Sequence, residues 1–256
     1  IQKECVPNLG YPWAFNGKVT IDAPVTLYYS KETKQNDGLL TGMAVHYYDN
    51  AAPDTMIGSE FVKGDNYDTL QVAFHDKKSD VCGGGSLNEP SIALLLANGK
   101  GRKSIPMTED AAKSGDWAKG ACLPNMGVHY WTDIENGSDL SFEAKYLFPI
   151  APMYNPNDGS LNGIMFVAAQ LMHTWDTNVC DLPPKTTPEC LTTTNFWDFG
   201  PGQTQKTTDP PVPGSMCYNF CGDTCPKLLT GALDVYDTMH WFFVEGGEST
   251  TCATRC

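Results

Sequence analysis

Alternating apolar and polar positions dominate this chain and predict a protein built mainly from β-strands. Short runs rich in Val, Leu, Ile, Tyr and Phe are separated by Gly, Pro, Asn and Asp, which is typical of strands joined by turns. A basic turn, GKGRK, is expected at residues 99–103. The strands are expected at residues 19–29, 39–48, 69–74, 92–97, 146–154, 160–171 and 233–244.

Two Asp-Gly pairs indicate where the chain turns back on itself. Asp37-Gly38 stands between the first two expected strands, and Asp158-Gly159 stands between two later ones. The central residues of a tight hairpin turn need positive φ, which Asp and Gly tolerate. We therefore expect one antiparallel hairpin at each pair.

Residues 108–119 form the one persuasive helical pattern. Thr108 is a suitable N-cap, and Glu109 and Asp110 follow it at the positive end of the helix dipole. The apolar face is thin, so a short helix is expected. Residues 181–216 are rich in Pro, Thr and Gly, which predicts an extended surface loop.

These patterns predict a mainly β fold, a disulfide-stabilised antiparallel sandwich or barrel-like domain with long loops and one or two short helices. The 256 residues are enough for one large domain with a real core. The frame N-D-G-x-L-x-G-apolar occurs at 36–43 and again at 157–164. This repetition suggests two related hairpin layers within the single domain, at about 19–100 and 120–245.

Ten cysteines, an even number, indicate a disulfide framework and an oxidising compartment. Zinc sites favour paired C-x2-C knuckles, whereas Cys217, Cys221 and Cys225 are spaced C-x3-C. The chain begins at Ile1, as a mature protein does after loss of a signal peptide. We therefore expect an extracellular protein that is glycosylated at the sequon beginning with Asn136.

The acidic composition argues against several kinds of partner. A formal net charge of −13, with no cluster of Lys or Arg to offset it, disfavours nucleic acid and anionic membrane surfaces. No apolar run approaches the roughly 18 residues of a membrane-spanning helix. A small molecule or a metal ion is the expected partner.

The candidate site is organised around residues 122–133, CLPNMGVHYWTD, in which one imidazole precedes two aromatic rings. Four of the five histidines stand beside aromatics in expected strands, which include a strand within residues 122–133 and the continuation of 160–171 as far as His173. Imidazoles from different strands can converge to bind Zn²⁺, Cu²⁺ or Fe²⁺, while neighbouring aromatics exclude water. His129 and His240 are the first candidate ligands, with His173 or His46 third. The pocket is expected to be walled by Tyr130, Trp131 and Trp241.

Three classes of function are compatible with these residues. The first is binding of a transition metal or small ligand at the histidine and aromatic pocket. The second is a metal-dependent secreted enzyme, hydrolytic or oxidative, which needs an open coordination position at the same site. The third is a structural, pigment or matrix protein whose histidines are core residues. A serine nucleophile is not indicated, because the glycine-rich run at 83–86 lacks the G-x-S-x-G frame.

Three motifs together resemble those of a group of secreted proteins of uncharacterised function. They are C-x-P-x-M-G-V-H-Y at 122–130, the Asp-Gly hairpin return at 158–164 and the aromatic strand at 236–243, which carries a histidine. Members of this group share an M-G-x-H-[YW] motif and a late Y-x-x-H-aromatic strand. The resemblance implies a β-rich secreted domain with His129 and His240 at the motif positions. This chain lacks the acidic residue expected in the hairpin return, where it has Ile-Met-Phe at 164–166.

Overall fold

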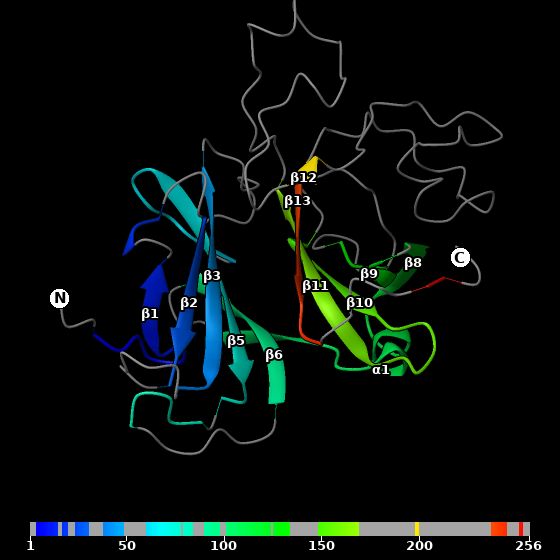
Figure 1. The fold of residues 1–256 in the computed structure, drawn as a ribbon, viewed down its shortest axis with the longest axis horizontal. Coiled ribbons are helices and arrows are strands. Elements are labelled where there is room, and N and C mark those ends of the chain that lie inside the picture. Colours follow the sequence, from blue (N-terminus) through cyan, green and yellow to red (C-terminus); the bar gives the residue numbers. More distant parts are fainter. Residues whose placement is uncertain are drawn as a thin grey trace, which may run out of the picture. The chain divides into compact units, whose positions relative to one another are not determined.

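Antiparallel strands make up most of the structure, which confirms the predicted mainly β fold. The chain divides into two compact units, Ile1–Ile105 and Pro106–Cys256, and each unit contains one sheet (Figure 1). The computed structural model describes residues 4–14, 17–19, 24–30, 38–48, 60–77, 79–83, 90–97, 101–123, 125–133, 148–168, 198–199, 237–244 and 251–252.

The sheet of the first unit has the strand order β1-β2-β3-β5-β6-β7, and β4 also pairs with β5. The expected hairpin across Asp37-Gly38 is confirmed, because β2 and β3 pair antiparallel. The basic turn expected at 99–103 is partly wrong, because its second half begins the edge strand β7. The strands are β1 (Tyr11–Ala14), β2 (Val25–Tyr29), β3 (Leu40–Tyr48), β4 (Phe61–Val62), β5 (Tyr67–His75), β6 (Pro90–Leu96) and β7 (Gly101–Ile105).

One face of this sheet is a hydrophobic core. Met43 lies opposite Val72, and Val72 lies opposite Leu94, so the three side chains share a face. All three are fully buried. Burial of one such side chain is worth about 1.5–3 kcal/mol, so this row of side chains stabilises the pairing of the three strands.

The N-terminal segment lies against the opposite face of the same sheet. Leu9 is fully buried and packs with Tyr28 and Ala44. The disulfide Cys5–Cys82 ties the segment to the turn that follows β5. The segment is therefore held to the sheet both by this disulfide and by the packing of Leu9.

The sheet of the second unit has the order β12-β13-β11-β10-β9-β8. Figure 1 shows β13 lying beside β11, although the two strands are far apart in the sequence. The hairpin expected at Asp158-Gly159 is confirmed as β10 and β11. The strands are β8 (Ala118–Leu123), β9 (Gly127–Trp131), β10 (Ile150–Tyr154), β11 (Leu161–Ala168), β12 (Asp198–Phe199) and β13 (Asp237–Phe242).

The helix of this unit, α1 (Glu109–Lys113), is shorter than the 108–119 pattern predicts. The predicted cap is confirmed, because the Thr108 hydroxyl accepts from the Ala111 amide at 3.2 Å. Only Ala112 of the helix is buried, so little apolar surface supports further turns. The chain instead enters β8 at Ala118.

Four of the ten cysteines lie in described positions, and all four form disulfides. Besides Cys5–Cys82, the bridge Cys122–Cys252 joins β8 to the C-terminal segment. The prediction of a disulfide-stabilised fold is thus confirmed for these cysteines, and the other six lie outside the described residues. Among the helices that the structure describes, none is long and apolar enough to span a membrane.

Candidate functional site

The two histidines ranked first from the sequence come together on the sheet of the second unit. The rings of His129 on β9 and His240 on β13 have centroids 6.3 Å apart and meet edge to face, at 83°. Two strands, β10 and β11, lie between β9 and β13. Neighbouring strands are about 4.8 Å apart, so the two backbones are on the order of 14 Å apart and the side chains lean toward each other.

Strand register places a methionine beside His129. His129 lies directly opposite Met153 on β10, and Met153 lies opposite Gly163 on β11. Directly opposed residues of antiparallel strands share a face, with Cβ atoms about 4.5–5.5 Å apart. The imidazole and the thioether are therefore neighbours on one face.

The same register places a second methionine beside His240. His240 lies opposite Met165 on β11, and Met165 lies opposite Ala151 on β10. Residues two apart on a strand share a face, so both His–Met pairs lie on the same side of the sheet. We call this side the histidine face, defined by His129, His240, Met153, Met165, Ala151 and Gly163.

Between the two histidines this face carries the small residues Gly163 and Ala151, which leave space above the sheet. A Cβ on Gly163 would lie 2.9 Å from the Cε of Met153 and 2.4 Å from the Trp241 carbonyl oxygen. Contacts this short do not occur for real side chains, so glycine is needed for the Met153 methyl to occupy that space. Ala151 adds only a methyl group, and the two imidazoles can approach above these positions.

A backbone carbonyl orients the ring of His129. Nδ1 lies 3.1 Å from the Gly127 oxygen. Because a carbonyl only accepts, Nδ1 carries the proton that it donates, and Nε2 of the neutral ring holds the lone pair. Gly127 has φ +102°, and a Cβ there would lie 2.4 Å from the Tyr154 oxygen. Glycine at this position therefore lets β9 begin close to β10 and presents the carbonyl to the ring.

Of the three predicted wall aromatics, one adjoins the histidine pair. Trp131 is two residues from His129, is 1% exposed, and stacks with its ring at 6.4 Å and 19°. Tyr130 and Trp241 each follow a histidine by one residue, so strand alternation puts them on the other face. The aromatics next to the histidines therefore lie on both faces of the sheet and do not all wall one pocket.

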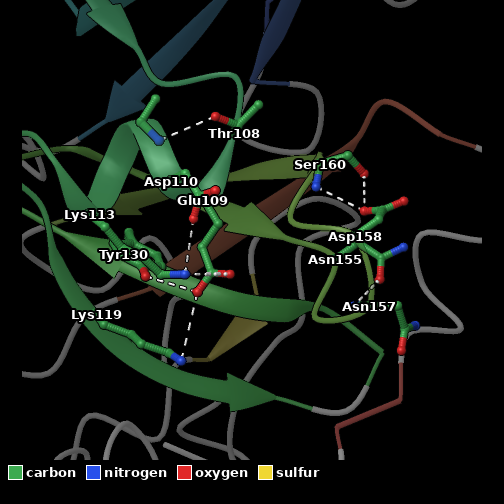
Figure 2. A network of polar contacts seen from close by, with 11 residues as sticks. Thr108, Glu109, Asp110, Lys113, Lys119, Tyr130, Asn155, Asn157, Asp158 and Ser160 are labelled. Carbon is green, nitrogen blue, oxygen red and sulfur yellow. Dashed lines mark hydrogen bonds and ion pairs between the residues drawn. The ribbon is translucent and has the colours of Figure 1, made fainter.

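Tyr130 belongs to a polar network on that other face (Figure 2). Its hydroxyl donates to Glu109 at 2.9 Å, and the same carboxylate pairs with Lys113 at 3.2 Å and Lys119 at 3.7 Å. Burial raises the pKa of Tyr130 well above its usual value, and the hydrogen bond to Glu109 adds to the increase. The network anchors α1 to β9 and fixes the strand that carries His129.

The remaining candidates lie elsewhere. His46 is on β3 in the first unit, where its Nε2 and Nδ1 lie 3.0 Å from the hydroxyls of Thr26 and Thr69. Burial lowers its pKa to about 4, so the ring is neutral at ordinary pH and serves as a polar link across three strands. His173 and Asn136 lie outside the described residues.

The donor atoms of the histidine face are two imidazole nitrogens and two thioether sulfurs. Within the described ranges, no group of three or more His, Cys, Asp or Glu side chains could hold a metal ion. Among the side chains of this face that the structure describes, the donors available to a metal are the two histidines together with Met153 and Met165. The methionines carry no local signal in the sequence, because their relation to the histidines depends on strand order and register.

Comparison with known proteins gives no further guide to the role of this face. No protein-family model, no curated protein and no solved structure matches the chain.

Proposed function

We propose that the chain binds a single transition metal ion on the histidine face of its second unit, between His129 and His240. The observation that carries the proposal is the approach of the two rings to 6.3 Å from strands that are not neighbours. A sheet that needed only core packing could fill this face with aliphatic side chains, at no cost in buried polar groups. A buried imidazole and a partly exposed one that meet from strands that are not neighbours are better explained by a shared ligand.

The donor set favours copper in its monovalent state. Thioether sulfur is a soft ligand that selects Cu(I), whereas Mg²⁺ and Ca²⁺ require oxygen ligands. Each histidine has a methionine as its direct cross-strand neighbour, Met153 for His129 and Met165 for His240. The Nδ1–H of His129 is held by the Gly127 carbonyl, which orients Nε2 as the ligand atom.

Burial supports binding rather than turnover. His129 and Met153 are both fully buried, whereas a catalytic metal site keeps a coordination position open to substrate. His240 is partly exposed and marks the side from which an ion would enter. The disulfides favour an oxidising, extracellular compartment as the place where the protein binds the metal. In that compartment the thioether ligands would hold copper in its reduced form.

The test is anaerobic titration of the purified chain with Cu(I), in competition with a coloured Cu(I) chelator. We expect one Cu(I) per chain, and X-ray absorption with both nitrogen and sulfur neighbours. His129→Gln and His240→Gln should each weaken binding by at least about tenfold, the loss of one ligand. His46→Gln is the matched control and should bind as the wild type does.

Three other outcomes have distinct meanings. Zn²⁺ binding that needs both histidines, with no Cu(I) binding, would overturn the copper assignment and the role of the thioethers. A coloured, metal-free protein would assign the face to an organic ligand. Absence of binding by Cu(I), Cu²⁺, Zn²⁺ and Fe²⁺ to a folded wild-type chain would overturn the proposal altogether.

A further inference from the structure

The first unit contains a separate groove of about 740 Å³ over strands β5, β6 and β7. Two rows of opposed residues form its floor. Gln71 lies opposite Leu95, which lies opposite Arg102. Ala93 and Ser104 form the adjacent row. The floor therefore alternates apolar side chains with a guanidinium, an amide and a hydroxyl, and its volume falls within the roughly 300–1,000 Å³ of small-molecule sites.

The charged group in this floor is only partly satisfied by the protein. One terminal nitrogen of Arg102, Nη1, donates to the His75 carbonyl at 2.8 Å. The other, Nη2, is buried and has no hydrogen-bond partner among the residues that the structure describes. A guanidinium presents its donors in a fixed planar fork that suits a carboxylate. Arg102 lines the groove together with Asp76, whose carboxylate interacts electrostatically with the guanidinium. Because Nη2 itself is covered, an anion in the groove would reach it only after a small shift of the Arg102 side chain.

The ring of His75 lies between two walls of the groove. Its Nε2 lies 3.0 Å from the Asn8 carbonyl and its Nδ1 lies 2.6 Å from the Asp76 carbonyl. Because a carbonyl only accepts, a neutral ring donates to one of the two. Asn8 and Asp76 both line the groove, from the N-terminal segment and from the end of β5. The disulfide Cys5–Cys82 holds the same two segments together. A site that is already formed loses less entropy when it binds a ligand.

The charges that line the groove suit a monoanion. Arg102 and Lys77 are cationic and Asp76 is anionic, which leaves one excess positive charge in a chain whose net charge is −13. A phosphate dianion would need more donors and more positive charge than this. The hydroxyls of Ser91 and Ser104 and the amide of Gln71 suit the hydroxyl groups of a ligand.

We infer that the first unit binds a hydroxylated carboxylic acid of the sugar-acid class in this groove. The carboxylate would bind the guanidinium of Arg102, the hydroxyl groups would face Gln71, Ser91 and Ser104, and the carbon skeleton would lie over Ala93 and Leu95. This site is distinct from the histidine face, which lies in the other unit. Neither proposal depends on the other.

The experiment is an NMR titration of the full chain with three sugars that share one skeleton. Glucuronate has the carboxylate, glucose lacks it, and glucose 6-phosphate replaces it with phosphate. We expect glucuronate to shift the amide resonances of β6 and β7, with an affinity at least about tenfold above those of the other two, because one charged hydrogen bond is worth that much.

Two variants and a matched control locate the carboxylate. Arg102→Gln should weaken glucuronate binding by at least about tenfold. Ser104 is exposed, so Ser104→Tyr should leave the fold intact, fill the groove and abolish binding. Lys103→Gln removes the same charge from the other face of β7, since Lys103 lies opposite Leu94, and should leave affinity unchanged.

Several results would overturn the inference. Equal affinity for glucose and glucuronate would show that no carboxylate is recognised. Tighter binding of glucose 6-phosphate would assign the groove to phosphate. Unchanged binding by a folded Ser104→Tyr variant would place the ligand elsewhere, and absence of any shift at millimolar glucuronate would exclude the site.

Discussion

Two strands of this protein carry almost the same sequence and place their histidines in different surroundings. Residues 43–48 read MAVHYY and residues 126–131 read MGVHYW. Residues 43–48 lie in β3 and residues 127–131 form β9 of the other unit, and both histidines are buried. His46 lies between two threonine hydroxyls, whereas His129 lies beside a methionine and approaches a second imidazole.

The difference comes from the neighbouring strands. Thr69 lies opposite His46 on β5, and Met153 lies opposite His129 on β10. Hydroxyls can both donate and accept, so they satisfy a neutral imidazole without a ligand. A thioether is only a weak acceptor, but it is a good ligand for a soft metal. A histidine motif alone therefore does not distinguish a core residue from a metal ligand.

The largest effect is expected from removing the disulfide of either unit. In the chain-entropy description, closing loops of 77 or 130 residues stabilises the fold by about 4–5 kcal/mol. We expect Cys5→Ser with Cys82→Ser to lower the protection of β3 amides from hydrogen exchange, while β9 amides stay protected. Cys122→Ser with Cys252→Ser should do the reverse. Equal loss of protection in both units would show that they unfold together.

The next largest effect is a pH dependence from His46. Its folded pKa of about 4 lies below the ordinary value of 6.5, so the unfolded chain binds the proton first as the pH falls. The stability due to the neutral ring is present above about pH 6.5 and is lost as the pH falls toward 4. The full difference corresponds to about 3 kcal/mol.

Urea unfolding of the wild type and of His46→Gln at pH 7.5 and pH 4.5 measures this effect. Carboxylates titrate in both proteins, so the difference between the two proteins isolates His46. NMR of the His46 ring should show no titration between pH 8 and pH 5. A ring that titrates near pH 6.5 would contradict the account of its surroundings.

A somewhat smaller effect should distinguish His129 from His46. If the second unit binds Cu(I), free Cu(I) at about 100 times its dissociation constant stabilises that unit by about 2.7 kcal/mol. We expect slower exchange of β9 amides and no change in β3. His129→Gln should remove the stabilisation, while His46→Gln should retain it. Stabilisation of β3 by Cu(I) would place a copper site in the first unit.

The smallest effect concerns the tyrosine that follows His129. Tyr130→Phe removes a hydrogen bond to the Glu109 carboxylate and should lower the free energy of unfolding of the second unit by about 1.5–2 kcal/mol. Tyr154→Phe is the matched control, since its hydroxyl donates to the uncharged Pro106 carbonyl at 2.8 Å. It should cost about 1 kcal/mol, as measured by exchange of β9 amides. A larger loss for Tyr154→Phe would reverse this ranking.

Local patterns were sufficient to predict much of the fold. Asp37-Gly38 and Asp158-Gly159 both lie between strands that pair as hairpins, because turn geometry is set by a few residues. The edge strand β7 was missed in part, because its sequence GRKSI is polar and resembles a turn. Its pairing with the apolar β6 is what makes it a strand.

The candidate site was predictable only in part. His129 and His240 were singled out by the aromatics beside them, and the structure does bring their rings together. Tyr130 and Trp241 were assigned to the same pocket because they are adjacent in sequence, but alternation puts adjacent residues on opposite faces. Met153 and Met165 carry no local signal, since their proximity depends on pairing across four strands. The resemblance to a group of secreted proteins stays a prediction.

The late position of β13 has a consequence for the order of events during synthesis. Roughly 70 residues separate β11 from β13, and a ribosome adds about 5–20 residues per second. For several seconds the growing chain therefore contains β8 to β11 but not the strand that brings His240. During that interval the β11 edge is exposed to other chains, which is a risk for aggregation. On the proposed function, the metal can be acquired only after this strand has docked, so loading would take place in the compartment where folding is completed.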